Sequence, residues 1–85
     1  MNLIFHKHFN KQYKKLAFLQ KQTDKRLTLF KEDPFNYALN NHPLVGKYFG
    51  YRSIDITGDY RAIYRPIDDN TAFFKTIDNH NNLYK

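Results

Sequence analysis

GDYRAIYR, residues 58–65, has the alternation of a β-strand, yet two of its side chains are arginines. Side chains two positions apart in a strand point to the same face of a sheet. Arg61, Ile63 and Arg65 therefore share one face. The opposite face holds residues that suit a core: Tyr60, Ala62 and Tyr64. The stretch predicts a strand inside a sheet that is apolar on one side and charged on the other.

Two further strands flank this one in the sequence. Residues 48–57 and 71–77 are separated from residues 60–67 by turns at Gly58-Asp59 and Asp68-Asp69-Asn70. The first of them places alternate residues on two faces, with Arg52, Ile54 and Ile56 on one and Tyr51, Ser53, Asp55 and Thr57 on the other. Charged side chains gather around the first turn: Asp55, Asp59 and Arg61.

The first half of the chain predicts a helical hairpin. Residues 2–6 suit a short strand, and residues 9–20 carry apolar side chains at helical spacing. Thr23-Asp24 offers an N-cap for a second helix. Asp33-Pro34 ends that helix, because the residue before a proline avoids helical geometry. The segment that follows, residues 34–47, looks irregular. The inner face of the second helix would carry Leu27 and Phe30.

The order of elements, β-α-α-β-β-β, predicts one α+β domain that spans residues 1–85. We expect the helical hairpin to pack on one face of a small, mainly antiparallel sheet. The helices can cover only one face of so small a sheet, so the other face should meet water or a ligand. Eight Phe and seven Tyr supply the apolar area that a domain of this size needs.

The charge is unevenly distributed along the chain. Residues 1–31 carry eight Lys or Arg and one acid, for a net charge of +7, whereas residues 32–85 carry −1. A basic half predicts an anionic partner, either a nucleic acid or an acidic protein. A run such as Lys11, Lys14 and Lys15 is equally typical of a solvated helix face. No segment has the length of a membrane span or a signal peptide core, so we expect a cytoplasmic protein that contacts no membrane.

Two histidines flank the predicted strands. His42 comes before the sheet, and His80 follows its last strand, with Tyr84 four residues on. Imidazole exchanges protons near neutral pH, and arginine holds a phosphate by two-point contact. With a carboxylate, this set fits RNA cleavage, in which the ribose 2′-hydroxyl attacks the neighbouring phosphate and the protein supplies acid, base and cation.

Other chemistries have less support in the residues. A zinc site would have His6 and His8 as its one closely spaced pair and no thiolate, and these two histidines are also typical of a polar surface. The three glycines are isolated, which argues against a phosphate-binding loop. We therefore expect neither a metal nor a cofactor.

The second half of the chain resembles the RelE superfamily of toxins from toxin–antitoxin pairs, and within it the YafQ branch. The resemblance covers residues 42–84 and rests on several short pieces: His42-Pro43-Leu44, Gly46, Gly50-Tyr51-Arg52, Asp59-Tyr60, His80 and Leu83-Tyr84. It implies a RelE-like fold and an endoribonuclease that cuts mRNA in the ribosomal A site without a metal. It also implies a cognate antitoxin that silences the toxin in a hetero-oligomer.

The resemblance implies a role for each matching residue. His80 would be the general acid, and Asp59 would be a catalytic carboxylate. His42 would lie at the rim of the site, and Arg61 would hold the phosphate, as in RelE and YoeB relatives. Tyr84 would support catalysis or stack on a base.

One position departs from the YafQ branch, which has a histidine where this chain has Asp55. An aspartate acts as a base only if its pKa rises well above about 3.9. Asp55 is therefore expected to orient or activate the 2′-hydroxyl. Contacts to RNA are expected from the basic residues Lys47, Arg52, Arg65, Lys11, Lys14 and Lys15.

Two other functions stay open. A ParE-like toxin shares the fold but poisons DNA gyrase, and that group lacks the catalytic set. A basic module that only binds RNA or the ribosome would bind without producing new RNA 5′ ends. DNA breaks would indicate a gyrase poison, and arrested translation with new RNA 5′ ends would indicate the ribonuclease. Tight binding without new ends would indicate the binding module.

Overall fold

A computed structural model describes residues 1–84. Its helices are α1 (Lys7–Lys15), α2 (Gln20–Glu32) and α3 (His80–Leu83), with short 3₁₀ turns η1 (Ala17–Leu19), η2 (Tyr37–Leu39) and η3 (Gly46–Tyr48). Its strands are β1 (Asn2–Phe5), β2 (His42–Pro43), β3 (Arg52–Asp55), β4 (Tyr60–Asp68) and β5 (Thr71–Asn79). They form one sheet in the order β1-β5-β4-β3-β2. β1 runs parallel to β5 and the other pairs are antiparallel, so the predicted α+β class is confirmed.

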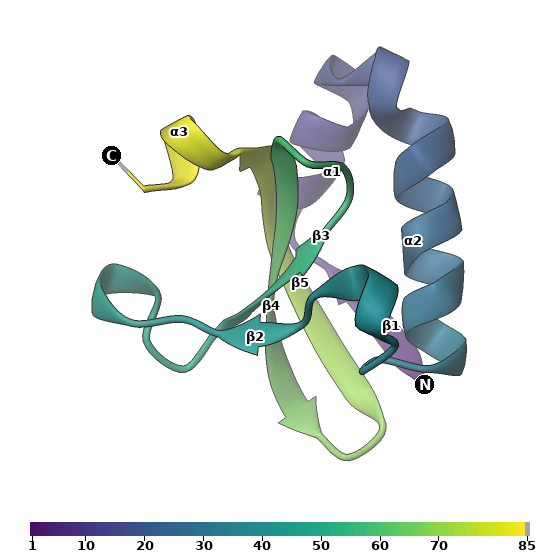
Figure 1. Ribbon diagram of the computed structural model, residues 1–85, viewed down its shortest axis with the longest axis vertical. Coiled ribbons are helices and arrows are strands. Elements are labelled where there is room, and N and C mark those ends of the chain that lie inside the picture. Colours follow the sequence, from purple (N-terminus) through teal and green to yellow (C-terminus); the bar gives the residue numbers. More distant parts are fainter. Residues whose placement is uncertain (85) are drawn as a thin grey trace.

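Helices α1 and α2 cover one face of the sheet, as Figure 1 shows. Phe30 of α2 lies with its ring centroid 4.8 Å from that of Tyr64 and 5.2 Å from that of Phe74, in edge-to-face geometry. Tyr64 and Phe74 belong to neighbouring strands. The predicted inward face of β4 is confirmed, because Ala62 and Tyr64 are buried in this core.

The opposite face of the sheet is partly covered, which corrects the expectation that it would be left to water or a ligand. Ile63 of β4 is buried there beneath Leu44 and Leu83, and Tyr48 and Tyr51 pack around them. Leu83 belongs to α3, which lies across the sheet from α1 and α2 (Figure 1). We call this side the open face, since only a small apolar cluster covers it.

The N-terminus of α2 differs from the prediction. The helix begins at Gln20, and Thr23 lies inside it with its hydroxyl donating to the carbonyl oxygen of Leu19 (2.9 Å). Asp24 instead accepts a hydrogen bond from the Tyr13 hydroxyl (2.6 Å). The chain enters α2 directly from η1, so no side chain caps its first turn. The predicted end is confirmed, since Glu32 is the last helical residue.

The strand predicted over residues 48–57 is shorter in the structure. η3 and Gly50, with a φ of +90°, bend the chain, so β3 begins at Arg52. Conversely, β2 forms within the segment that was expected to be irregular, by pairing His42 with Ser53.

Candidate functional site

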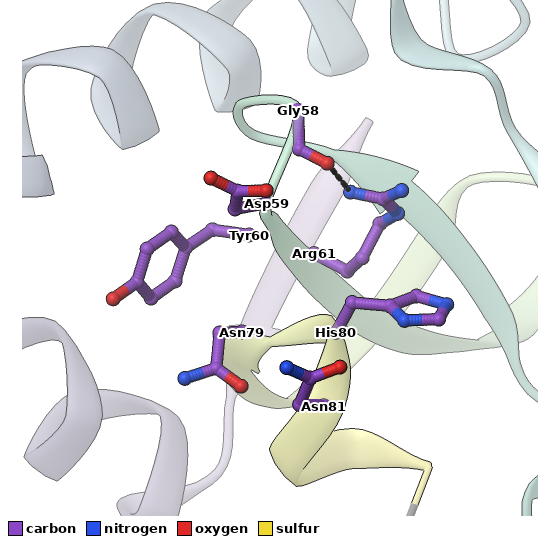
Figure 2. Close-up of a pocket in the computed structure, with 7 residues that line it drawn as sticks. All are labelled: Gly58, Asp59, Tyr60, Arg61, Asn79, His80 and Asn81. Carbon is purple, nitrogen blue, oxygen red and sulfur yellow. Dashed lines mark hydrogen bonds between the residues drawn. The ribbon is translucent and has the colours of Figure 1, made fainter.

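An open pocket lies at the end of the sheet, where the β3–β4 turn meets the first residue of α3. Its volume is about 570 Å³, and Figure 2 shows the residues that line it: Gly58, Asp59, Tyr60, Arg61, Asn79, His80 and Asn81. The backbone N–H of His80 donates to the carbonyl oxygen of Asp59 (2.8 Å). This bond joins α3 to the turn, so two segments far apart in the sequence form one site.

Arg61 is held in place by three neighbours. Its Nε lies 3.0 Å from Asp55 Oδ1, although that oxygen accepts no properly directed hydrogen bond from residues 1–84. Its Nη1 donates to the carbonyl oxygens of Gly58 (2.8 Å) and Thr57 (3.2 Å). The second terminal nitrogen, Nη2, makes no hydrogen bond within the described residues. The guanidinium is therefore fixed on one side and available to a ligand on the other.

His80 is the first residue of α3 and is exposed. The Asn79 side chain caps this helix by accepting from the backbone N–H of Asn82 (2.8 Å). One helical turn on, the Tyr84 ring packs against the imidazole with a centroid separation of 4.7 Å. The cap and the tyrosine orient the imidazole at the mouth of the pocket.

The side chains around the pocket do not all point the same way. In Figure 2 the His80 ring and the Arg61 guanidinium lie on one side of the strand end. The Asp59 carboxylate lies on the other side, with the ring of Tyr60. The structure therefore brings His80 and Arg61 together, whereas Asp59 shares their pocket from the far side of the turn.

Asp78 is a site residue that the sequence analysis missed. Arg61 pairs in register with Asp78 of β5 on one side and with Asp55 of β3 on the other, so it stands in a row between two acidic residues, and its guanidinium pairs with Asp55. Asp78 Oδ1 accepts hydrogen bonds from the Asn79 backbone (2.8 Å) and the Asn82 side chain (3.2 Å). The alternation of residues 76–78 could have indicated this face once the register with β4 was known.

Tyrosines and cations form a wall beside the pocket on the open face. Burial, followed by the nearby Tyr84 and Asp78, raises the pKa of Tyr48 above its ordinary 10.0. Tyr48 therefore lies close to both of these site residues and keeps its phenolic proton. Lys47 Nζ lies 5.2 Å from the ring centroid of Tyr48. Stacked bases and phosphates are suitable ligands for such a surface.

A second cation of the predicted RNA-binding set belongs to the same wall. Tyr51 packs edge-to-face on Tyr48, with a centroid separation of 6.2 Å. The Arg65 guanidinium lies 6.0 Å from the centroid of the Tyr51 ring. The structure thus places Lys47 and Arg65 along one aromatic row.

A family model described as the bacterial toxin of type II toxin–antitoxin system, YafQ, matches residues 1–85. The chain belongs to the YafQ family. The match confirms the resemblance drawn from residues 42–84 and extends it to the helical half. No curated protein sequence matches the chain at a significant level.

Solved structures of toxins share the fold. YafQ from E. coli strain BL21(DE3) is 20% identical over 99% of this chain and 98% of its own, with a TM-score of 0.83. The E. coli DinJ–YafQ toxin–antitoxin complex is 21% identical over 99% and 97%, with a TM-score of 0.81. The YoeB/ParE toxin from Agrobacterium tumefaciens is 22% identical over 94% and 99%, with a TM-score of 0.77. At these identities the likeness shows the fold.

The histidine expected at the rim of the YafQ-like site, His42, is not a lining residue of the pocket. Its Nδ1 lies 2.7 Å from the carbonyl oxygen of Asn40, and it pairs with Ser53 on the open face. β2 is separated from β5 by three strand spacings, about 14 Å at the usual spacing of about 4.8 Å. His42 therefore belongs to a strand at the far edge of the sheet from β5, and it does not line the pocket that contains His80.

Arg52 takes part in packing at the edge of the sheet rather than in the pocket. Its Nε donates to Asn41 Oδ1 (2.8 Å), and its guanidinium lies 5.3 Å from the centroid of the Phe35 ring. Asn41 in turn donates to the hydroxyl of the core residue Tyr64 (2.8 Å). A role for Arg52 in binding RNA stays a prediction.

Three lysines of the predicted RNA-binding set lie exposed on α1: Lys11, Lys14 and Lys15. The last two belong to the final turn of the helix, which leads into η1. Phe18 of η1 packs edge-to-face on the pocket residue Tyr60, with a centroid separation of 5.8 Å. The basic end of α1 therefore lies near the pocket.

Residues 1–84 contain neither a cluster of metal ligands nor a helix that could span a membrane. No group of three or more His, Cys, Asp or Glu side chains lies close enough together there to hold a metal ion. No helix in this part of the chain is both long and apolar enough to cross a membrane.

Proposed function

We propose that this YafQ-family toxin is an endoribonuclease that cleaves mRNA in the ribosomal A site without a metal ion. The observation that carries the proposal is one open pocket lined by His80, Arg61 and Asp59, in which Asp55 holds the Arg61 guanidinium. A proton donor, carboxylates and a fixed cation in one place are the groups that phosphodiester cleavage requires.

The reaction follows from these groups. The ribose 2′-hydroxyl attacks the adjacent phosphorus, and the bond from phosphorus to the 5′-oxygen breaks. His80 protonates the leaving 5′-oxygen, and the uncommitted Nη2 of Arg61 binds the phosphate oxygens. Tyr84 holds the imidazole and presents a ring on which a base can stack.

We assign the base to Asp59 and a positioning role to Asp55. Asp59 is exposed and lines the pocket, so a change of rotamer, fast in exposed side chains, turns its carboxylate toward the 2′-hydroxyl. Asp55 is occupied by Arg61, whose Nη1 in turn holds the carbonyl oxygens of the turn that carries Asp59. Asp55 would therefore orient the cation and the turn rather than accept a proton.

The partners follow from the family and the charge. DinJ is the antitoxin in the E. coli YafQ complex, and we propose that a cognate antitoxin binds and silences this toxin in the cytoplasm. The basic residues of α1 would contact ribosomal RNA, with Lys47 and Arg65 along the mRNA.

The proposal is tested by mapping RNA 5′ ends in a purified translation reaction, with and without ribosomes. We expect new ends at A-site codons that require ribosomes. Ends that form without ribosomes would keep the nuclease and remove the A-site mechanism. No new ends, with DNA breaks in the presence of gyrase, would favour a gyrase poison. Tight ribosome binding with intact RNA would favour a passive binding module.

A further inference from the structure

We propose that a second pocket, beside the first, binds a backbone phosphate of the RNA next to the one that is cleaved, an inference that rests on the proposed ribonuclease function. This second pocket has a volume of about 420 Å³ and lies between the start of α1, β5 and α3. The residues that give it its chemistry are His6, His8, Tyr48, Lys75, Asp78 and Asn82.

A β-bulge turns Lys75 into this pocket. Ile63 of β4 pairs with Thr76, but the next residue, Tyr64, pairs with Phe74, so Lys75 is an extra residue without a partner on β4. Bulges re-aim side chains and are frequent next to active sites. The Lys75 side chain makes no ion pair or hydrogen bond within residues 1–84. Its ammonium group is thus a cation available to an external anion.

The histidine pair supplies further hydrogen-bond donors. The Nδ1 of His6 accepts a hydrogen bond from the backbone N–H of His8 (3.0 Å), so in the neutral ring the proton resides on Nε2. The His6 ring is also held edge-on by Phe73, with a centroid separation of 5.8 Å. His6 therefore presents a fixed N–H donor near the Lys75 ammonium group, and His8 adds a second imidazole.

The one acid in the second pocket is already engaged. Asp78 Oδ1 accepts hydrogen bonds from Asn79 and Asn82, which reduces its repulsion of an incoming phosphate. The other ionisable lining groups carry donors: two imidazoles, an ammonium group and the Tyr48 hydroxyl. This balance favours a single phosphate over a cation.

The two pockets flank the same short helix. Asn79, His80 and Asn81 line the first pocket, and Asn82 and Leu83 line the second. A single-stranded RNA that crosses α3 would therefore place consecutive phosphates in the two pockets. Lys75 would fix the register of the strand, so that the scissile phosphate meets Arg61 and His80.

The test measures binding of a short RNA that carries a 2′-deoxy nucleotide at the cleaved position. Uncharged methylphosphonate linkages are introduced one at a time, and the wild type is compared with Lys75→Ala and with the control Lys21→Ala, an exposed lysine on α2. We expect Lys75→Ala to weaken binding several-fold and to make the slope of log K against log salt shallower by about 0.7. One methylphosphonate beside the cleaved position should weaken binding to the wild type and have no further effect on Lys75→Ala.

Equal binding by Lys75→Ala and Lys21→Ala, or losses that simply add with every methylphosphonate, would overturn the phosphate site. The phosphate site would also be overturned if the RNA does not bind, or if Lys75→Ala weakens only the complex with the antitoxin. Cleavage is assayed separately in a purified translation reaction, on an mRNA that keeps its 2′-hydroxyls, because the proposed cut requires ribosomes. If the wild type binds with the predicted pattern but never cuts, the second pocket stands and the ribonuclease function fails. If the wild type cuts and Lys75→Ala binds RNA as the wild type does, the ribonuclease function stands and the second pocket fails.

Discussion

The two faces of the sheet differ in what their side chains do. Beneath the helices, rings such as Phe30, Tyr64 and Phe74 interlock and are almost fully buried. On the open face a small apolar cluster surrounds Ile63. Two residues away along β4, Arg61 stands in a row with Asp55 and Asp78. Tyr64 and Arg61 belong to the same strand, β4, so this strand contributes to stability on the helix-covered face and to chemistry on the open face.

Removal of the imidazole at position 80 should have the largest effect. We expect His80→Ala to lower the cleavage rate by about 10²–10⁴, the usual contribution of a general acid. Because the side chain is exposed, the free energy of unfolding should change by less than about 0.5 kcal/mol. Single-turnover cleavage and urea unfolding measure the two quantities. Asn81→Ala, a neighbouring substitution in the same pocket, is the control. Similar rates for the two variants would remove His80 from the chemistry.

The opposite face should respond in the opposite way. Phe30→Ala leaves a cavity beneath the helices and should lower the free energy of unfolding by about 3–5 kcal/mol. The fraction that remains folded should cleave at the wild-type rate, because Phe30 does not touch the pocket. Activity per folded molecule, measured alongside urea unfolding, checks this separation. A folded but inactive Phe30→Ala would mean that the two faces are coupled.

The two acids near the turn sharpen the comparison within the open face. Asp59→Asn should abolish the rise of the cleavage rate with pH, because it removes the base. Asp55→Asn should lower the rate by a smaller factor and keep that rise, because Asp55 acts through Arg61. Rate profiles across pH distinguish the roles. If Asp55→Asn flattens the pH profile and Asp59→Asn leaves it intact, the roles of base and positioning residue are exchanged between the two acids.

The smallest expected effect concerns alkaline stability on the helix-covered face. Burial raises the pKa of Tyr64 above 10.0, although Asn41 and Arg52 lower it in part. The folded protein therefore holds this proton more tightly than the unfolded chain, and the stability present below pH 10 is lost as pH rises through the raised pKa. Urea unfolding of Tyr64→Phe should show a shallower alkaline decline than the wild type. Tyr37→Phe, at an exposed position, should match the wild type.

Sequence patterns predicted the features that depend on local geometry. The alternation of residues 60–64 assigned the two faces of β4 correctly, and Asp33-Pro34 marked the end of α2. The sequence predicted His80 at the end of the last strand, and in the structure His80 lines the pocket at that end.

The missed features depend on contacts between distant segments. β2 has two residues and exists because His42 pairs with Ser53, and the bulge at Lys75 is defined only by the register with β4. The same register places Asp78 opposite Arg61, a proximity that local sequence patterns do not indicate. The side of the turn to which Asp59 points depends on how Arg61 holds the turn, which alternation does not encode.

The most direct test of the site on the open face is to determine the chemical groups at the two RNA ends that cleavage produces. Cleavage by the 2′-hydroxyl should leave a 5′-hydroxyl on one fragment and a 2′,3′-cyclic phosphate on the other, and a 2′-deoxy nucleotide at the mapped position should abolish the cut. Mass spectrometry of the fragments reads both ends. A 5′-phosphate, or cutting of the deoxy substrate, would contradict the assignment of the acid, base and cation to His80, Asp59 and Arg61.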